Sequence, residues 1–257
     1  MSSRREFLAS LAAVSAAGAL TPRAARAIGE PPVGAARLKV PGLQPARVGA
    51  VATLMRVVGE NTSVVTASEV AEVAGESPAL FSYPFVVLAG DDGFEPLPDE
   101  AVANLRLFLR EGGFLFIDDA SGVRGSEFDA SVRRDLARIL PGADLARIGR
   151  DHAVYRSFFL MGAIAGRVQV QPYLEGIWLG DITPVLYSTN DVLGAWLQGP
   201  DGRPALDCVP DGERQRTQAE RFGLNLVLFA LTSNYKRDAV HVRTLLERMS
   251  RQGGYSR

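Results

Sequence analysis

The chain of 257 residues has one cysteine, Cys208, and two histidines. A single thiol can form neither an internal disulfide nor a thiolate metal cluster. Lysine occurs only at Lys39 and Lys236, and the net charge is −1 because arginine supplies the other positive charges. The chain therefore lacks the basic excess that is typical of nucleic-acid-binding proteins, and we expect no nucleic-acid partner.

The chain also lacks an apolar run of membrane-spanning length. The most apolar early stretch runs from Leu8 to Leu20, and its roughly 13 residues fall short of the ~20 that a spanning helix needs. We therefore expect no transmembrane segment in the mature chain. A hydrophobic content of 47% and a charged content of 22% are ordinary for a globular protein.

The first 27 residues have the three parts of an export signal. Arg4 and Arg5 precede Phe7-Leu8 and an apolar, alanine-rich stretch, and Ala25 and Ala27 form a small-x-small cleavage site. This pattern predicts a twin-arginine signal peptide over residues 1–27, cleaved after Ala27. It predicts the twin-arginine export machinery as a partner and a periplasmic or otherwise exported location. The alternatives are an uncleaved anchor and a basic terminus without a targeting role.

The rest of the chain divides at a segment rich in proline and glycine. Residues 28–46 predict an irregular lead-in with one short strand at 37–40, and residues 47–257 predict a single domain. Spacing and β-branched content predict a helix over 48–58, a strand over 61–66 and a short helix over 68–74.

The best-defined unit is a strand, a helix and a second strand. Residues 85–89 are continuously apolar, which is typical of a strand buried on both faces. Pro98-Asp99-Glu100 begins a helix, Gly112-Gly113 ends it, and residues 114–117 form a second apolar strand. This order is a parallel crossover unit. It predicts an α/β domain with a mostly parallel central sheet and helices on both faces, in which these two strands are adjacent.

The remaining elements are predicted less sharply. We expect helices over 128–140, 217–231 and 239–250, short strands over 168–170, 177–179 and 184–188, and a mobile loop over 198–213.

Short motifs spread along the chain resemble two related groups of proteins. The motifs are Tyr83-Pro84-Phe85, Gly112-Gly113-Phe114-Leu115, Asp118-Asp119, Phe128 with Arg133-Arg134, Asp151-His152, Leu174-Glu175-Gly176, Tyr187-Ser188-Thr189-Asn190-Asp191 and Gly223-Leu224-Asn225. Over 83–140 the chain resembles the class I glutamine amidotransferase-like fold. Over nearly the whole mature chain it resembles the bacterial domain-of-unknown-function family 4159. The resemblance implies a flavodoxin-like three-layer domain without an established activity.

The departure from the amidotransferases concerns their nucleophile. The resemblance places their catalytic cysteine on the turn after the second strand, where this chain has Asp118. Cys208 lies far downstream, and no His-x-Glu pair follows near the end of the chain. The resemblance therefore implies that glutamine hydrolysis is absent. Relatives also occur as parts of larger membrane proteins, which implies an envelope protein as a possible partner.

Carboxylates follow both predicted strands of the crossover unit. Asp91-Asp92 follow the first strand, and Asp118-Asp119 end the second. Ligands of open parallel sheets bind beyond the carboxyl ends of the strands. Asp118, Asp119 and His152 are therefore candidate catalytic residues, as metal ligands or as a general base with an imidazole, and a divalent metal is the candidate cofactor. The alternative is that these acids cap helices or bind arginines such as Arg124 and Arg133.

Further polar residues are candidates for binding a ligand. They are Asp91, Asp92, Ser121, Glu175, Asn190 and Asp191. Ser121 is not in a G-x-S-x-G elbow, which argues against a serine nucleophile. Glu175, Asn190 and Asp191 are turn formers in the alternative interpretation, and His152 is then a loop residue that fixes local structure.

Two hypotheses about function follow. The first is a non-catalytic, amidotransferase-like binding or scaffold domain of the cell envelope, because the nucleophile position holds aspartate. The second is a hydrolase, metal-dependent or not, that acts on a small envelope metabolite through Asp118, Asp119 and His152. The sequence names neither substrate nor metal.

Overall fold

Two central strands are buried along their whole length. They are β3 (Phe85–Gly90) and β4 (Phe114–Asp119). They pair in parallel from Phe85 opposite Phe114 to Gly90 opposite Asp119, and helix α3 (Asp99–Arg110) connects them. This arrangement confirms the predicted crossover unit.

The structure is a computed structural model that describes the backbone of residues 31–252 and the side chains of residues 31–233. The predicted signal peptide, with Arg4, Arg5, Ala25 and Ala27, lies outside the described residues. The described residues from Pro32 onward belong to one compact unit.

The sheet has seven strands in the order β2-β1-β3-β4-β7-β6-β5. The neighbours from β2 to β7 pair in parallel, whereas β6 pairs antiparallel with both β7 and β5. This confirms a mostly parallel sheet in an α/β protein. The other strands are β1 (Val33–Lys39), β2 (Thr66–Ala74), β5 (Ala146–Arg147), β6 (Glu175–Leu179) and β7 (Ile182–Ser188).

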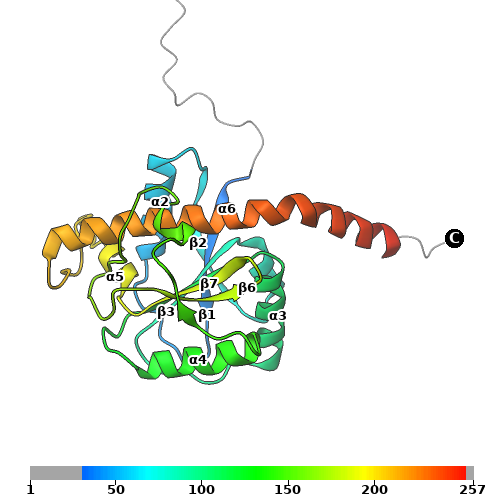
Figure 1. Ribbon diagram of the computed structural model, residues 1–257, viewed down its shortest axis with the longest axis horizontal. Coiled ribbons are helices and arrows are strands. Elements are labelled where there is room, and N and C mark those ends of the chain that lie inside the picture. Colours follow the sequence, from blue (N-terminus) through cyan, green and yellow to red (C-terminus); the bar gives the residue numbers. More distant parts are fainter. Residues whose placement is uncertain (1–30, 253–257) are drawn as a thin grey trace, which may run out of the picture. The chain divides into compact units, whose positions relative to one another are not determined.

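Helices cover both faces of the sheet (Figure 1). One core packs the sheet against α2 (Ala50–Asn61), α5 (Val192–Trp196) and α6 (Gly212–Gln252). The other core packs it against α3 and α4 (Glu127–Ile139). Short 3₁₀ helices, η2 (Pro78–Ser82) and η3 (Ala153–Tyr155), lie in the connections. In the part of the chain that the structure describes, no helix combines the length and the apolar character that a membrane span needs.

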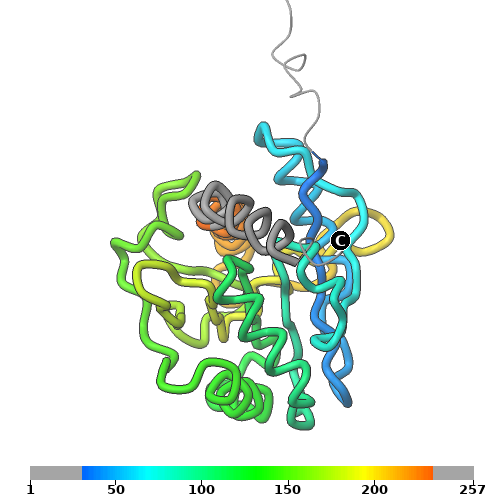
Figure 2. The backbone as a smooth tube through the Cα atoms, turned by 90° about the vertical axis from the view of Figure 1, so that its right-hand side faces the viewer, coloured from blue at the N-terminus to red at the C-terminus, as the bar shows by residue number. Residues whose placement is uncertain are grey.

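The structure differs from the prediction in the first third of the domain. The short strand predicted over 37–40 in an irregular lead-in is strand β1, which runs from Val33 to Lys39 and lies inside the sheet between β2 and β3 (Figure 2). Its first half went unrecognised because Gly34, Ala35 and Ala36 do not favour a strand. The short helix predicted over 68–74 is wrong. These residues form β2, an edge strand whose largely half-exposed side chains give no clear apolar alternation.

Two later predictions also change. Residues 168–170 form no strand. The two predicted C-terminal helices, over 217–231 and 239–250, are parts of one helix, α6.

Candidate functional site

The carboxyl ends of three parallel strands lie side by side and bring polar residues together. Asp119, at the end of β4, is opposite Gly90 of β3, and Asp118 is opposite Ser188 of β7. The turn after β3 carries Asp91 and Asp92, and the segment after β7 carries Asn190 and Asp191. The structure therefore brings most of the predicted polar residues to one edge of the sheet, as the strand order requires.

Asp118 is completely buried and serves as a helix cap. Its Oδ1 accepts a hydrogen bond from the backbone N–H of Val192 at 3.0 Å, and its Oδ2 accepts one from Leu193 at 2.8 Å. Burial raises the pKa of Asp118 well above its usual value, and the neighbouring charge of Asp191 adds to the increase, while the two N–H donors oppose it. Both oxygens are thus occupied by the first turn of α5, which is the structural role that the sequence left open.

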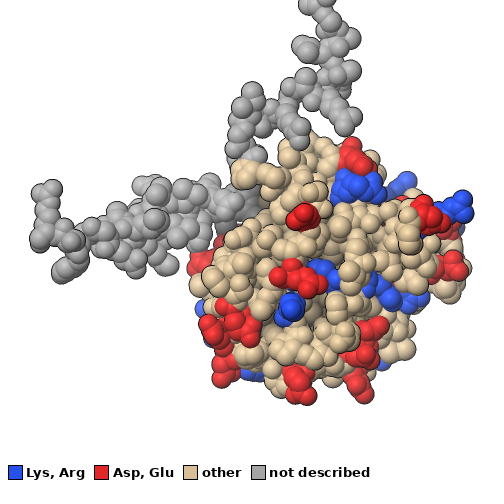
Figure 3. All heavy atoms as spheres, turned by 180° about the vertical axis from the view of Figure 1, so that it is seen from behind, with Lys and Arg blue, Asp and Glu red and all other residues tan. Residues whose placement is uncertain are grey.

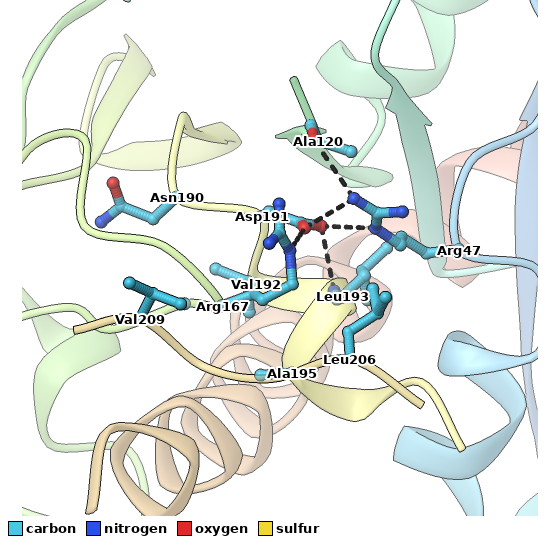
Figure 4. Close-up of polar contacts among 12 residues, drawn as sticks. Arg47, Ala120, Arg167, Asn190, Asp191, Val192, Leu193, Ala195, Leu206 and Val209 are labelled. Atoms are coloured by element: carbon cyan, nitrogen blue, oxygen red, sulfur yellow. Dashed lines mark hydrogen bonds and ion pairs between the residues drawn. The ribbon is translucent and has the colours of Figure 1, made fainter. Parts of the chain in front are cut away.

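Asp191 is also completely buried and binds two arginines (Figure 4). Arg47 donates from Nε to Oδ1 at 2.8 Å and from Nη2 to Oδ2 at 2.7 Å. Arg167 donates to Oδ2 from the other side, and Asp191 caps α5 by accepting from the Gly194 N–H at 3.1 Å. The hydrogen bonds that Arg47 donates to Asp191 raise the pKa of Arg47. Two guanidinium groups therefore bind one buried carboxylate.

The same ion pair joins two strained backbone positions. Arg47 (φ 55°) and Asp191 (φ 49°) are the only non-glycine residues with a positive φ among those that the structure describes. Aspartate tolerates this left-handed region moderately well, and arginine tolerates it poorly. Such strained conformations persist only where the surrounding contacts hold the backbone in place. The bidentate pair supplies such contacts, since it links the loop after β1 to the loop after β7.

Asp119 belongs to a second network that reaches the surface. It accepts a hydrogen bond from the hydroxyl of Ser126 at 2.6 Å and from the backbone N–H of Ser121 at 2.9 Å. The hydroxyl of Tyr187 lies 3.4 Å from Asp119 and donates to Asp129 at 2.9 Å. Burial, and then the charges of Asp119 and Asp129, raise the pKa of Tyr187. Ser121 thus orders a turn by its backbone, and among the described residues its hydroxyl bonds only with the backbone of Val123.

The other predicted ligand-binding residues have mainly structural contacts. Glu175 accepts from Arg133 at 2.6 Å. Asn190 holds the backbone of Gln171, accepting from its N–H at 2.9 Å and donating to its carbonyl oxygen at 2.7 Å. Asp91 and Asp92 are exposed in their turn, and Asp91 lies close enough to contribute to the raised pKa of Arg47.

His152 does not join these carboxylates. Its Nε2 lies 3.1 Å from Oγ1 of Thr183, and its Nδ1 accepts from the Val154 N–H at 3.2 Å as the cap of η3. Burial lowers the pKa of His152. Thr183 lies at the start of β7, whereas Ser188, opposite Asp118, ends it. Five residues of strand separate these positions by about 16 Å, so the imidazole lies toward the opposite edge of the sheet.

The described residues contain no group of three or more histidine, cysteine, aspartate or glutamate side chains placed to hold a metal ion. Cys208 is buried, and burial raises the pKa of its thiol. The buried side chains of Asp118, Asp119 and Asp191, at the carboxyl ends of the strands, are therefore already bonded to backbone N–H groups, hydroxyls and arginines.

Sequence reasoning missed the two arginines that complete this edge. Neither Arg47, just after the predicted lead-in, nor Arg167, just before the predicted strand over 168–170, is among the predicted site residues. The signal for Arg47 was its position just after a strand of the parallel sheet, and that strand went largely unrecognised. Arg167 has no such signal, because a long irregular segment carries it to the edge.

Comparison with family models identifies the family of the chain. Residues 36–231 match the family model described as a domain of unknown function (DUF4159). The match covers most of the chain, and the chain therefore belongs to this family. A search of curated proteins found no match.

Proposed function

We propose that the chain is a non-catalytic, class I glutamine amidotransferase-like binding or scaffold domain of the cell envelope. The observation that carries this proposal is the state of Asp118. It stands where the resemblance places the amidotransferase nucleophile, yet it has no exposed surface and both of its oxygens cap α5. A reacting group must reach its substrate, and a buried carboxyl group held in this way stabilises the loop after β7 instead.

The strand order supports the finer fold assignment. Numbered along the chain, the five parallel strands have the order 2-1-3-4-5, which is the order of flavodoxin-like sheets. In such sheets ligands bind beyond the carboxyl ends of the strands, in the crevice between the first and third strands. Here Arg47 follows β1 and crosses to Asp191. The internal ion pair thus lies at the carboxyl ends of the strands, the side of the sheet on which ligands of such folds bind.

The twin-arginine pattern of Arg4 and Arg5 supports the proposed envelope location. The charge of the surface supports a protein partner over a polyanion. On the face shown in Figure 3, acidic and basic side chains are interspersed without a large field of one sign. Surfaces with mixed charge favour specific protein contacts over non-specific electrostatic binding.

The experiment that tests this role is affinity capture of the tagged full chain from the periplasmic fraction. We expect the wild-type chain to be exported and to recover a partner protein at a constant ratio. The matched control is the double variant Arg4→Lys with Arg5→Lys, which keeps both charges but removes the guanidinium groups that the export receptor reads. It should stay in the cytoplasm and lose the partner.

Normal export of the double variant would refute the assignment of the pathway. An exported wild-type chain that recovers no partner at a constant ratio would refute the scaffold role.

The hydrolase hypothesis gains no support from the geometry. It requires His152 beside Asp118 and Asp119, and His152 instead contacts Thr183 at the start of β7.

A further inference from the structure

His152 lies at the start of the short helix η3 and uses both nitrogens of its ring. A neutral imidazole has a proton on one nitrogen and a lone pair on the other. Nδ1 accepts a hydrogen bond from the backbone N–H of Val154 at 3.2 Å, which assigns the proton to Nε2, 3.1 Å from Oγ1 of Thr183. His152 therefore caps η3 only while its imidazole is neutral, because a protonated Nδ1 has no lone pair to accept with.

The surroundings of the imidazole oppose a positive charge. Its ring centre lies 5.0 Å from that of Phe229 on α6 and 6.4 Å from that of Trp178 on β6. Burial lowers the pKa of His152 below its usual 6.5, the charge of Asp151 opposes this shift, and that of Arg156 adds to it. The contacts on β6, β7 and α6 are uncharged, so none of them offers a carboxylate to an imidazolium.

The capped helix leads into a loop with exposed apolar side chains. η3 ends at Tyr155, and the loop after it carries Phe158, 46% exposed, and Leu160, 91% exposed. The N–H of Met161 donates to the carbonyl oxygen of Tyr155 at 2.8 Å, which closes the loop back on η3. The N–H of Phe158 donates to Oδ1 of Asn225 on α6 at 3.0 Å. Loss of the η3 cap therefore frees the ends of the loop, whereas the contact with α6 retains its middle.

The contribution of this cap to stability depends on pH with a definite sign. Because the folded-state pKa of His152 is lowered, the contribution is fully present above pH 6.5. It is lost as the pH falls through the lowered folded-state pKa, where the folded chain takes up a proton at the cost of the bond to Val154.

We propose that His152 is a pH-sensitive switch, whose protonation breaks the cap of η3 and opens segment 153–161 while the sheet stays folded. This inference goes beyond the proposed scaffold function, because it concerns the control of one surface segment by pH.

The test is amide hydrogen exchange of the full chain, followed by mass spectrometry from about pH 8 to about pH 4, on both sides of the ordinary histidine pKa. The rates are corrected for the intrinsic pH dependence of exchange. We expect segment 153–161 to exchange about fivefold faster at the acidic end, because losing a side-chain cap typically weakens the first turn of a helix about that much. Peptides from β3 serve as the internal reference and should not change.

His152→Asn is the matched variant. Asparagine is among the best N-cap residues, and its amide oxygen accepts a hydrogen bond without titrating. This variant should keep segment 153–161 protected at every pH. His152→Ala removes the acceptor and should show the faster exchange at every pH. His241→Asn changes the other histidine of the chain and should respond to pH as the wild type does.

Three results would overturn the proposal. One is a wild-type chain in which the corrected exchange of segment 153–161 is the same across the pH range. Another is a His152→Asn variant, folded by circular dichroism, that keeps the full response to pH. The third is that β3 peptides accelerate together with segment 153–161, because the domain then unfolds as a whole. None of these results bears on partner capture at a fixed pH, so the switch and the scaffold role fail independently.

Discussion

Replacing Asp191 with alanine is expected to lower the free energy of unfolding by about 3–5 kcal/mol, because removing one partner of a buried ion pair leaves its charge uncompensated. The side chains of Arg47 and Arg167 are only 17% and 22% exposed, so water replaces the lost carboxylate incompletely. The variant also loses the cap on Gly194 and the contact that holds two strained backbone positions. Urea unfolding followed by circular dichroism measures the effect.

The matched control is Glu60→Ala. Glu60 pairs with Arg56 at 2.8 Å, but both side chains are more than half exposed. Such exposed helix pairs contribute about 0.3–0.5 kcal/mol, so this control should stay close to the wild type. If Asp191→Ala lost no more stability than Glu60→Ala, the ion pair would not hold the edge together.

Replacing Asp118 with asparagine is expected to cost about 1–3 kcal/mol at acidic pH, because one of two buried N–H groups loses its acceptor. The cost should shrink as the pH rises. Burial, and then the charge of Asp191, hold the folded-state pKa of Asp118 above its usual value of 3.8. Folding therefore favours the protonated carboxyl, and this contribution to stability is fully present below pH 3.8.

The contribution is lost as the pH rises through the raised folded-state pKa. Asparagine does not titrate, so the difference in unfolding free energy between the wild type and Asp118→Asn should fall from acidic toward neutral pH. Urea unfolding at several pH values measures this difference. Asp181→Asn, at an exposed turn, is the control and should change stability by no more than about 0.5 kcal/mol. A difference that grew with pH would mean that Asp118 is stabilised as a carboxylate.

The fold was predictable where burial dictates the sequence. Strands β3 and β4 are buried on both faces, so their residues are continuously apolar, and proline, acids and glycines mark the ends of α3. Strand β2 lies at the edge of the sheet, and the first half of β1 contains a glycine and two alanines, so neither strand has a clear pattern. The positions of β1 and β2 in the sheet depend on pairing with strands that are distant in the sequence, and local periodicity does not reveal such pairing.

The position of a candidate site residue was predictable where that residue ends a strand recognised by its continuous apolar sequence. Residues at the ends of recognised strands, such as Asp118 and Asp119, could be placed at one edge because parallel strands share their direction. His152 and Arg167 lie on irregular segments, whose path depends on tertiary contacts such as the bond between His152 and Thr183. The sequence analysis therefore placed His152 too close to Asp118 and Asp119, and it gave no position for Arg167.

The central claim is that Asp118 is a structural cap in a domain without a catalytic role. The most direct measurement incubates the full chain with a metabolite extract of the cell envelope and follows every species by mass spectrometry, beside the folded Asp118→Asn variant. Our account predicts that both proteins leave the extract unchanged. A metabolite that the wild-type chain consumes at many turnovers, and that Asp118→Asn leaves intact, would contradict it.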